Sequence, residues 1–285
     1  MYWNIIWIFL IVSALCCIIG FKRIVYFLSI GYGFSVFGLG IAYLVVSIVN
    51  NTFDIIGLIQ VILICIYGFR LSFFLLKREL KNASYKKVLE DATKNSDSSN
   101  KLFIKIIIWI SVAILYFLQT CPIFFRAQNG NIWQFGQSFN SSAFVMPVIG
   151  IVISIIGLLL EGISDWQKSK QKAVRQDMVA TKGLYKICRT PNYFGERIFW
   201  LGIFLGGITS YNCAWQWVSA ILGYVLIFYV MINSAKRLGK KQDKRYGKME
   251  EYNKYIEITP LYFPYAPRFI VRKIYNKKKE KQNKK

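Results

Sequence analysis

Polar residues that could do chemistry are concentrated in one short stretch, residues 182–202, which reads KGLYKICRTPNYFGERIFWLG. It holds Arg189, Asn192, Tyr193 and Glu196 at the mouth of an otherwise apolar segment. Ionisable groups at membrane depth are costly and usually mark a working site. A segment that only had to cross lipid would not need these side chains, so they are candidates for binding or catalysis.

The same stretch contains the signals for a helix start. Thr190 suits the N-cap position, and Pro191 suits the first helical position, where its missing N–H costs nothing. The loop before it is basic, and a helix N-terminus that faces a basic loop suits a phosphate-bearing ligand. A proline-started helix beside a positively charged loop explains the same residues without a ligand, and the pattern alone leaves both interpretations open.

A second group of polar residues lies upstream, in EGISDWQKSKQK. Glu161 and Asp165 are four residues apart and share one helical face, which Lys172 continues. A carboxylate can accept hydrogen bonds from ribose hydroxyls or an amide, and lysines hold phosphates. An ordinary charged helix end accounts for the same spacing.

Tyr67 and Arg70 form a third candidate pair, in IYGFRLSFFLLKRE. They lie about one turn apart on the same side of an apolar helix. A phenol beside a guanidinium can donate a proton to a developing enolate. The alternative is that Arg70 reaches to the membrane interface while Tyr67 is simply packed.

The fourth candidate is the block KRLGKKQDKRYGKMEEYNKYIEITPLYFP near the C-terminus. It combines the cations Arg237 and Arg245 with Tyr246 and Tyr252, which could cradle an adenine and a 2′-phosphate. The same residues could instead form an interfacial helix with an aromatic belt.

Composition limits the classes of function. The chain has 285 residues, 55% of them hydrophobic and 17% aromatic, which predicts an integral membrane protein. It has no histidine, which excludes histidine-based zinc sites and Ser-His-Asp triads. The net charge of +23 is distributed over alternate loops and the tail, which favours contact with anionic lipid headgroups over nucleic acid.

The apolar runs predict an all-α, polytopic protein with seven transmembrane helices. Basic segments fall at residues 22–23, 77–101 and 168–189 and in the tail, which places the N-terminus outside and the C-terminus in the cytosol. We expect one membrane domain over residues 1–265 and a basic, disordered tail over 266–285. Cys121 and Cys213 fall near the same membrane face, where a disulfide is possible. The expected helices are residues 3–21, 24–49, 55–76, 102–125, 143–161, 192–208 and 217–233.

The run RTPNYFGERIFW resembles the signature of the steroid 5-alpha-reductase-like membrane proteins, especially a bacterial branch long classed as a domain of unknown function. Relatives read close to R-H-P-N-Y-x-G-E, and Thr190 here replaces the histidine. The resemblance implies that Asp165 and Lys172 contact NADPH, with Glu161 at a position often held by asparagine. It also implies that the C-terminal block covers the nucleotide, with Arg189, Asn192, Tyr193, Arg237, Arg245, Tyr246 and Tyr252 among the cofactor-binding residues.

By the same resemblance, Tyr67 in its Tyr-x-x-Arg motif with Arg70 binds the substrate carbonyl, and the nicotinamide lies beside Glu196. The glutamate that relatives place on the second helix has no counterpart here. The implied function is reduction by NADPH of a carbon–carbon double bond conjugated to a carbonyl, in a lipophilic substrate from the bilayer. The membrane would be the cytoplasmic membrane in a bacterium or the endoplasmic reticulum in a eukaryote.

Two other functions stay open at this point. One is an S-adenosylmethionine-dependent membrane methyltransferase of isoprenylcysteine or phospholipid type, to which the signature is more loosely similar. Glu250 and Glu251 form a pair as in those enzymes, but in a different context. The other is a lipid-binding membrane protein without enzymatic activity.

Overall fold

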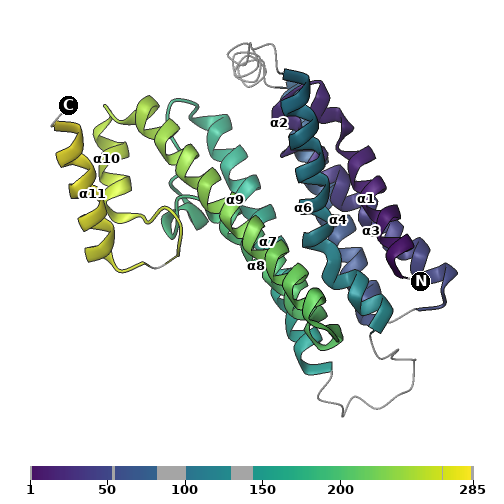
Figure 1. Ribbon diagram of the computed structural model, residues 1–285. Helices are drawn as coiled ribbons and strands as arrows, with labels where there is room; N and C mark the ends of the chain where they lie inside the picture. Colours follow the sequence, from purple (N-terminus) through teal and green to yellow (C-terminus); the bar gives the residue numbers. More distant parts are fainter. Residues whose placement is uncertain (1, 53–54, 82–100, 130–143, 265, 284–285) are drawn as a thin grey trace. The chain divides into compact units, whose positions relative to one another are not determined.

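The computed structural model describes residues 2–52, 55–81, 101–129, 144–264 and 266–283, and the regular elements within these ranges are helices (Figure 1). The prediction of an all-α, multi-pass membrane protein is confirmed by the length and composition of these helices. Five described stretches are long and apolar enough to cross a membrane: Ile24–Val49, Ile55–Leu80, Leu102–Asn129, Val145–Val174 and Ala214–Tyr246.

Two of the seven expected crossings are shorter than these five. The first, α1 (Tyr2–Cys16), has 15 residues. The second, α8 (Pro191–Gly207), has 17 residues and includes both Glu196 and Arg197. A helix needs about 20 residues to span the hydrocarbon core, so length and composition alone do not assign these two as crossings.

The chain divides into two compact units. Unit 1 comprises Met1–Val152 and Leu201–Leu226, and unit 2 comprises Ile153–Trp200 and Ile227–Lys285. We expected a single domain over residues 1–265. Among the described helices, α7 (Val145–Val174), α8 and α9 (Ala214–Tyr246) contribute residues to both units.

Unit 1 is held together by close helix packing and by aromatic side chains. Its own helices are α1, η1 (Ile18–Phe21), α2 (Ile24–Phe27), α3 (Ile30–Val49), α4 (Ile55–Lys81), α6 (Lys101–Asn129) and η4 (Ile208–Ser210). A Cβ added to Gly68 of α4 would lie 2.5 Å from the Gly33 carbonyl oxygen of α3, so only glycine permits this approach. The ring of Phe9 lies 4.4 Å from Tyr43 and 5.2 Å from Phe124, between ring centroids.

The first two expected helices are each interrupted. α1 ends at Cys16 and is followed by η1, and the second expected helix breaks between α2 and α3. Ser29 adopts φ −130° and ψ −94° there, and its hydroxyl donates to the Val25 carbonyl at 2.8 Å. This side-chain bond competes with the continuing helix, which is a common effect of serine.

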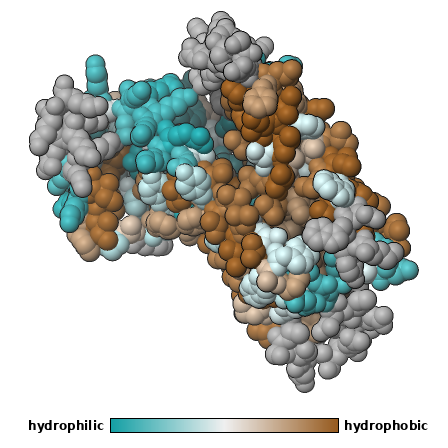
Figure 2. All heavy atoms as spheres, viewed as in Figure 1, coloured by the Kyte–Doolittle hydropathy of each residue, from teal (hydrophilic) through white to brown (hydrophobic). Residues whose placement is uncertain are grey.

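Unit 2 packs the end of α7 and the loop after it against the C-terminal segments. Its further elements are η3 (Gly183–Lys186), α10 (Glu250–Ile258) and α11 (Arg268–Asn283). Met178, Val179, Tyr246, Tyr252 and Ile256 form a small buried core. In Figure 2, hydrophilic surface gathers over the C-terminal end of α9 and over α10.

Both α7 and α9 continue beyond their apolar parts. We predicted that α9 ends near residue 233, but it extends to Tyr246. Residues 234–246 read SAKRLGKKQDKRY, and lysine, arginine, glutamine and alanine are good helix formers. The charges therefore end the part that can lie in lipid, but they do not end the helix.

Two expected irregular regions fall partly outside the described residues. The polar segment at 77–101 begins inside α4, and its residues 82–100 lie outside the described ranges. The loop expected at 126–142 begins within α6, and residues 130–142 are likewise outside. The tail that we expected to be disordered contains α11. Cys121 is a buried free thiol and Cys213 an exposed one.

Candidate functional site

The candidate site in unit 2 depends on close contact between α7 and α8. A Cβ added to Gly195 of α8 would lie 2.6 Å from the Glu161 backbone nitrogen, and one added to Gly157 would lie 2.3 Å from that of Phe199. The Ser154 hydroxyl also donates to the Phe199 carbonyl at 3.2 Å. These contacts bring the acidic face of α7 beside the first turns of α8.

The start of α8 is fixed as the sequence predicts. The helix begins at Pro191, and the Thr190 carbonyl accepts the Phe194 N–H at 3.1 Å, as an N-cap residue does. The Thr190 hydroxyl donates to the Leu261 carbonyl at 2.6 Å, and the Arg189 N–H donates to the Pro260 carbonyl at 2.8 Å. The segment after α10 is therefore held against the entrance of α8.

Arg189 lies at the centre of a buried polar network. Its Nη2 donates to the Tyr252 hydroxyl at 3.0 Å and to Oε1 of Gln242 at 3.3 Å, and it lies 4.0 Å from Oδ1 of Asp243. The Tyr252 hydroxyl in turn donates to that Asp243 oxygen at 2.7 Å. Burial raises the pKa of Tyr252, so this phenol remains a donor at neutral pH.

Arg197 is a buried cation that the sequence interpretation missed. Its Nη2 donates to the Tyr262 carbonyl at 2.6 Å, and its guanidinium lies over the rings of Phe194, Phe228 and Phe263 at 5.4, 5.3 and 5.0 Å. The sequence signal that could have identified Arg197 is its position directly after Glu196 in the FGER run. Cation–π contacts with three rings suit a charge that stabilises the fold around α8.

The three predicted carboxylates are all buried. Glu161 is 3% exposed, Asp165 7% and Glu196 6%. Buried carboxylates are retained only where cations or hydrogen bonds compensate them. Together with the buried arginines, they make this part of unit 2 a charged interior.

Tyr185 of η3 is a second residue that the sequence interpretation missed. Its side chain is buried, and the raised pKa of its phenol is caused first by burial and next by the charges of Asp165, Tyr255 and Tyr193. Its hydroxyl has no hydrogen-bond partner among the described residues. Tyr185 lies within the stretch 182–202, but nothing in its local pattern separates it from a packed aromatic residue.

One of the residues predicted in the C-terminal block, Tyr246, contacts the end of α7. Lys172 donates from Nζ to the Tyr246 hydroxyl at 2.9 Å, and the Arg245 guanidinium lies 5.3 Å from the Tyr246 ring centroid. Arg237 is exposed and donates to the Ser234 hydroxyl at 3.0 Å. Asn192 is half-buried in the first turn of α8.

Comparison with known proteins places this architecture in a family. Residues 30–259 match the family described as "Protein of unknown function (DUF1295)", which covers more than half of the chain. The chain belongs to the DUF1295 family. Searches of curated proteins and of solved structures returned no match.

In this DUF1295 protein, Tyr67 and Arg70 belong to unit 1, whereas the other predicted site residues belong to unit 2. Tyr67 is fully buried on α4, and its hydroxyl donates to the Tyr32 hydroxyl of α3 at 3.1 Å. The two rings meet edge to face with centroids 6.0 Å apart. Arg70 is half-buried one turn further along α4.

Proposed function

We propose that this DUF1295 protein is a membrane reductase that uses NADPH to reduce a carbon–carbon double bond conjugated to a carbonyl in a lipophilic substrate. The resemblance of the RTPNYFGE run to steroid 5-alpha-reductase-like proteins suggests the reaction class. The observation that supports it best is the close packing of α8, at Gly195, against Glu161 of α7. This packing sets the buried Glu161 beside the helix that carries Asn192 and the buried Glu196.

The donors in this interior fit a ligand rich in oxygen atoms and negative charge. Among the described residues, the buried Nε of Arg189 and the buried hydroxyl of Tyr185 have no hydrogen-bond partner. Leaving a buried donor unsatisfied costs roughly 1–3 kcal/mol, and a bound phosphate or carboxamide oxygen would remove that cost. A diphosphate is therefore a suitable partner for these groups.

Each candidate residue has a role that matches its chemistry. Arg189 and Lys172 would hold phosphate oxygens, and Asp165 would accept hydrogen bonds from ribose hydroxyls. The backbone N–H groups at the N-terminus of α8 would add donors around Asn192. NADPH, when bound, supplies the hydride, and Tyr67 would donate its hydroxyl proton toward the carbonyl oxygen of the substrate.

We also propose the seven-crossing arrangement with an outside N-terminus and a cytosolic C-terminus. The alternating positions of the basic segments support it, since cytosolic loops carry an excess of lysine and arginine. In this arrangement the nucleotide reaches unit 2 from the cytosol and the substrate enters from the bilayer.

Binding of NADPH to purified full-length protein in detergent tests the proposal directly. Isothermal titration of NADPH should give saturable binding that Asp165→Asn weakens at least about tenfold, because one good hydrogen bond to a charged group is worth ~1.5 kcal/mol or more. Asp177→Asn is the matched control, because that carboxylate is exposed and lies in the loop after α7.

The competing functions predict different titrations. Saturable binding of S-adenosylmethionine without binding of NADPH would favour the methyltransferase, and binding of neither would favour a lipid-binding protein. If NADPH binds, a panel of lipophilic enones should oxidise it in the presence of the protein, and Tyr67→Phe should abolish turnover without changing NADPH affinity.

A further inference from the structure

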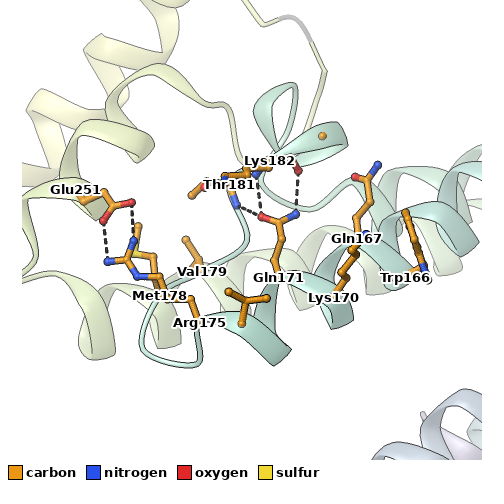
Figure 3. Close-up of a pocket in the computed structure, with 12 residues that line it drawn as sticks. Trp166, Gln167, Lys170, Gln171, Arg175, Met178, Val179, Thr181, Lys182 and Glu251 are labelled. Atoms are coloured by element: carbon orange, nitrogen blue, oxygen red, sulfur yellow. Dashed lines mark hydrogen bonds and ion pairs between the residues drawn. The ribbon is translucent and has the colours of Figure 1, made fainter.

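A cavity of about 450 Å³ lies on the opposite face of α7 from the candidate cofactor residues. Its walls come from the end of α7, the loop that follows and the start of α10, all within unit 2 (Figure 3). Trp166, Lys170 and Val174 line it, whereas Glu161, Asp165 and Lys172 lie on the other side of the helix.

Two glutamines of α7 fix the shape of this cavity. Oε1 of Gln171 accepts the N–H groups of Thr181 and Lys182, both at 2.9 Å, and its Nε2 donates to the Lys182 carbonyl at 3.1 Å (Figure 3). Oε1 of Gln167 accepts the Leu184 N–H at 2.9 Å. Gly183, which lies between Lys182 and Leu184, has φ +68°, a conformation that glycine adopts without strain.

The charge of the cavity is positive. Arg175 is already paired, with Nη2 2.8 Å from Oε2 of Glu251 and Nε 3.5 Å from Oδ1 of Asp177. Lys170 and Lys182 contribute the remaining charges among the lining residues. Lys170 extends over the Trp166 ring, with Nζ 5.2 Å from the centroid. The site therefore suits an anion with one or two negative charges.

The exposed face of α7 carries apolar residues next to this cavity. Leu159, Ile163, Trp166, Lys170 and Val174 repeat at intervals of three and four residues, so they form one stripe, and all are exposed. Trp166 is 60% exposed. A tryptophan followed by a lysine along an apolar stripe is typical of the boundary between hydrocarbon and headgroups.

We propose that the cavity binds the phosphate headgroup of an anionic phospholipid from the surrounding bilayer. The phosphate pairs with Lys170 and Lys182, and an acyl chain lies along Ile163 and Leu159. A soluble phosphate would use the two lysines but would gain nothing from the exposed apolar stripe. The site goes beyond the proposed reductase function and does not depend on it.

Quenching of Trp166 fluorescence tests this assignment. Delipidated full-length protein in neutral detergent is titrated with phosphatidylglycerol that carries brominated acyl chains. The same titration of Trp166→Phe gives the quenching of the other tryptophans. The difference between the two titrations is the quenching of Trp166, which reports binding at the cavity. Phosphatidylglycerol should quench at a concentration at least about tenfold lower than brominated phosphatidylcholine. The double variant Lys170→Gln/Lys182→Gln should weaken binding by about 25-fold, since each lysine near a membrane surface contributes about fivefold.

The control is Lys240→Gln/Lys248→Gln, which removes the same charge from exposed lysines outside the cavity and should change binding less than about twofold. Equal binding of phosphatidylcholine, or an equal loss in both double variants, would overturn the proposal. Displacement by millimolar inorganic phosphate would assign the cavity to a soluble anion instead. Displacement by NADPH would assign the cavity to the nucleotide. That result would overturn the phospholipid proposal while leaving NADPH binding, and with it the reductase proposal, intact.

Discussion

For Tyr185, a structural role and a functional role predict opposite results. Its hydroxyl is buried and has no hydrogen-bond partner among the described residues. Tyr185→Phe should therefore leave the free energy of unfolding unchanged or raise it slightly, by up to ~1 kcal/mol. If the hydroxyl serves the nucleotide, NADPH affinity should fall by roughly tenfold. Thermal unfolding and titration of the same sample check both, with the exposed Tyr229→Phe as the control.

At the same scale, the sequence predicted residues whose role is encoded in local spacing. Asp165 and Lys172 share a helix face, and Arg189 directly precedes a helix start, so their positions follow from periodicity and capping rules. Asp243 and Tyr185 were not predicted. Asp243 joins the buried network through Arg189, which lies far from it in the chain, and Tyr185 is influenced by the charge of Asp165 on another helix. Such contacts are set by the packing of η3 and α10, which no local pattern records.

Among the elements, the contact between α7 and α8 is the one on which the candidate site depends. Gly195→Ala would place a methyl group 2.6 Å from the Glu161 backbone nitrogen and 2.9 Å from the Gly157 carbonyl oxygen. Because backbone atoms cannot move aside cheaply, we expect a loss of ~1–3 kcal/mol and a lower melting temperature. The affinity for NADPH should also fall in this variant.

Gly162→Ala on α7 is the matched control. An added Cβ there meets nothing within 4 Å, and alanine is favoured over glycine in a helix by up to ~1 kcal/mol. This variant should melt at the same temperature or higher. Equal destabilisation by both substitutions would show that α7 tolerates no change near Glu161, and it would remove the special role of the Gly195 contact.

Helix positions were predictable because long apolar runs are strong signals, whereas helix ends were not. The start of α8 was predicted to within one residue because Thr190-Pro191 marks it. The extension of α9 to Tyr246 was missed, since the change from apolar to charged residues marks a membrane boundary and not a helix end. The break at Ser29 was missed as well, because it depends on a single side-chain bond to Val25.

For the whole molecule, contacts inside unit 2 constrain the path of the chain through the membrane. Thr190 bonds to Leu261 and Arg189 to Pro260, so the entrance of α8 and the segment after α9 and α10 lie on the same side. α9 is long and apolar enough to cross a membrane. If α9 does cross, α8 must cross as well despite its 17 residues, as in the seven-crossing arrangement that we propose.

This reasoning predicts that the turn between α8 and α9 lies on the opposite side of the membrane from the C-terminal segments. Cys213 in that turn is an exposed free thiol, whereas Cys188 is buried and its burial raises the pKa of its thiol, which makes it less reactive. A membrane-impermeant maleimide added to intact cells should therefore label the native protein at Cys213. Cys213→Ser should remove this label, and Cys213→Ser/Lys240→Cys should be labelled only after permeabilisation. Labelling of Cys213 only after permeabilisation would contradict the seven-crossing orientation, because it would place the turn in the cytosol together with the basic tail.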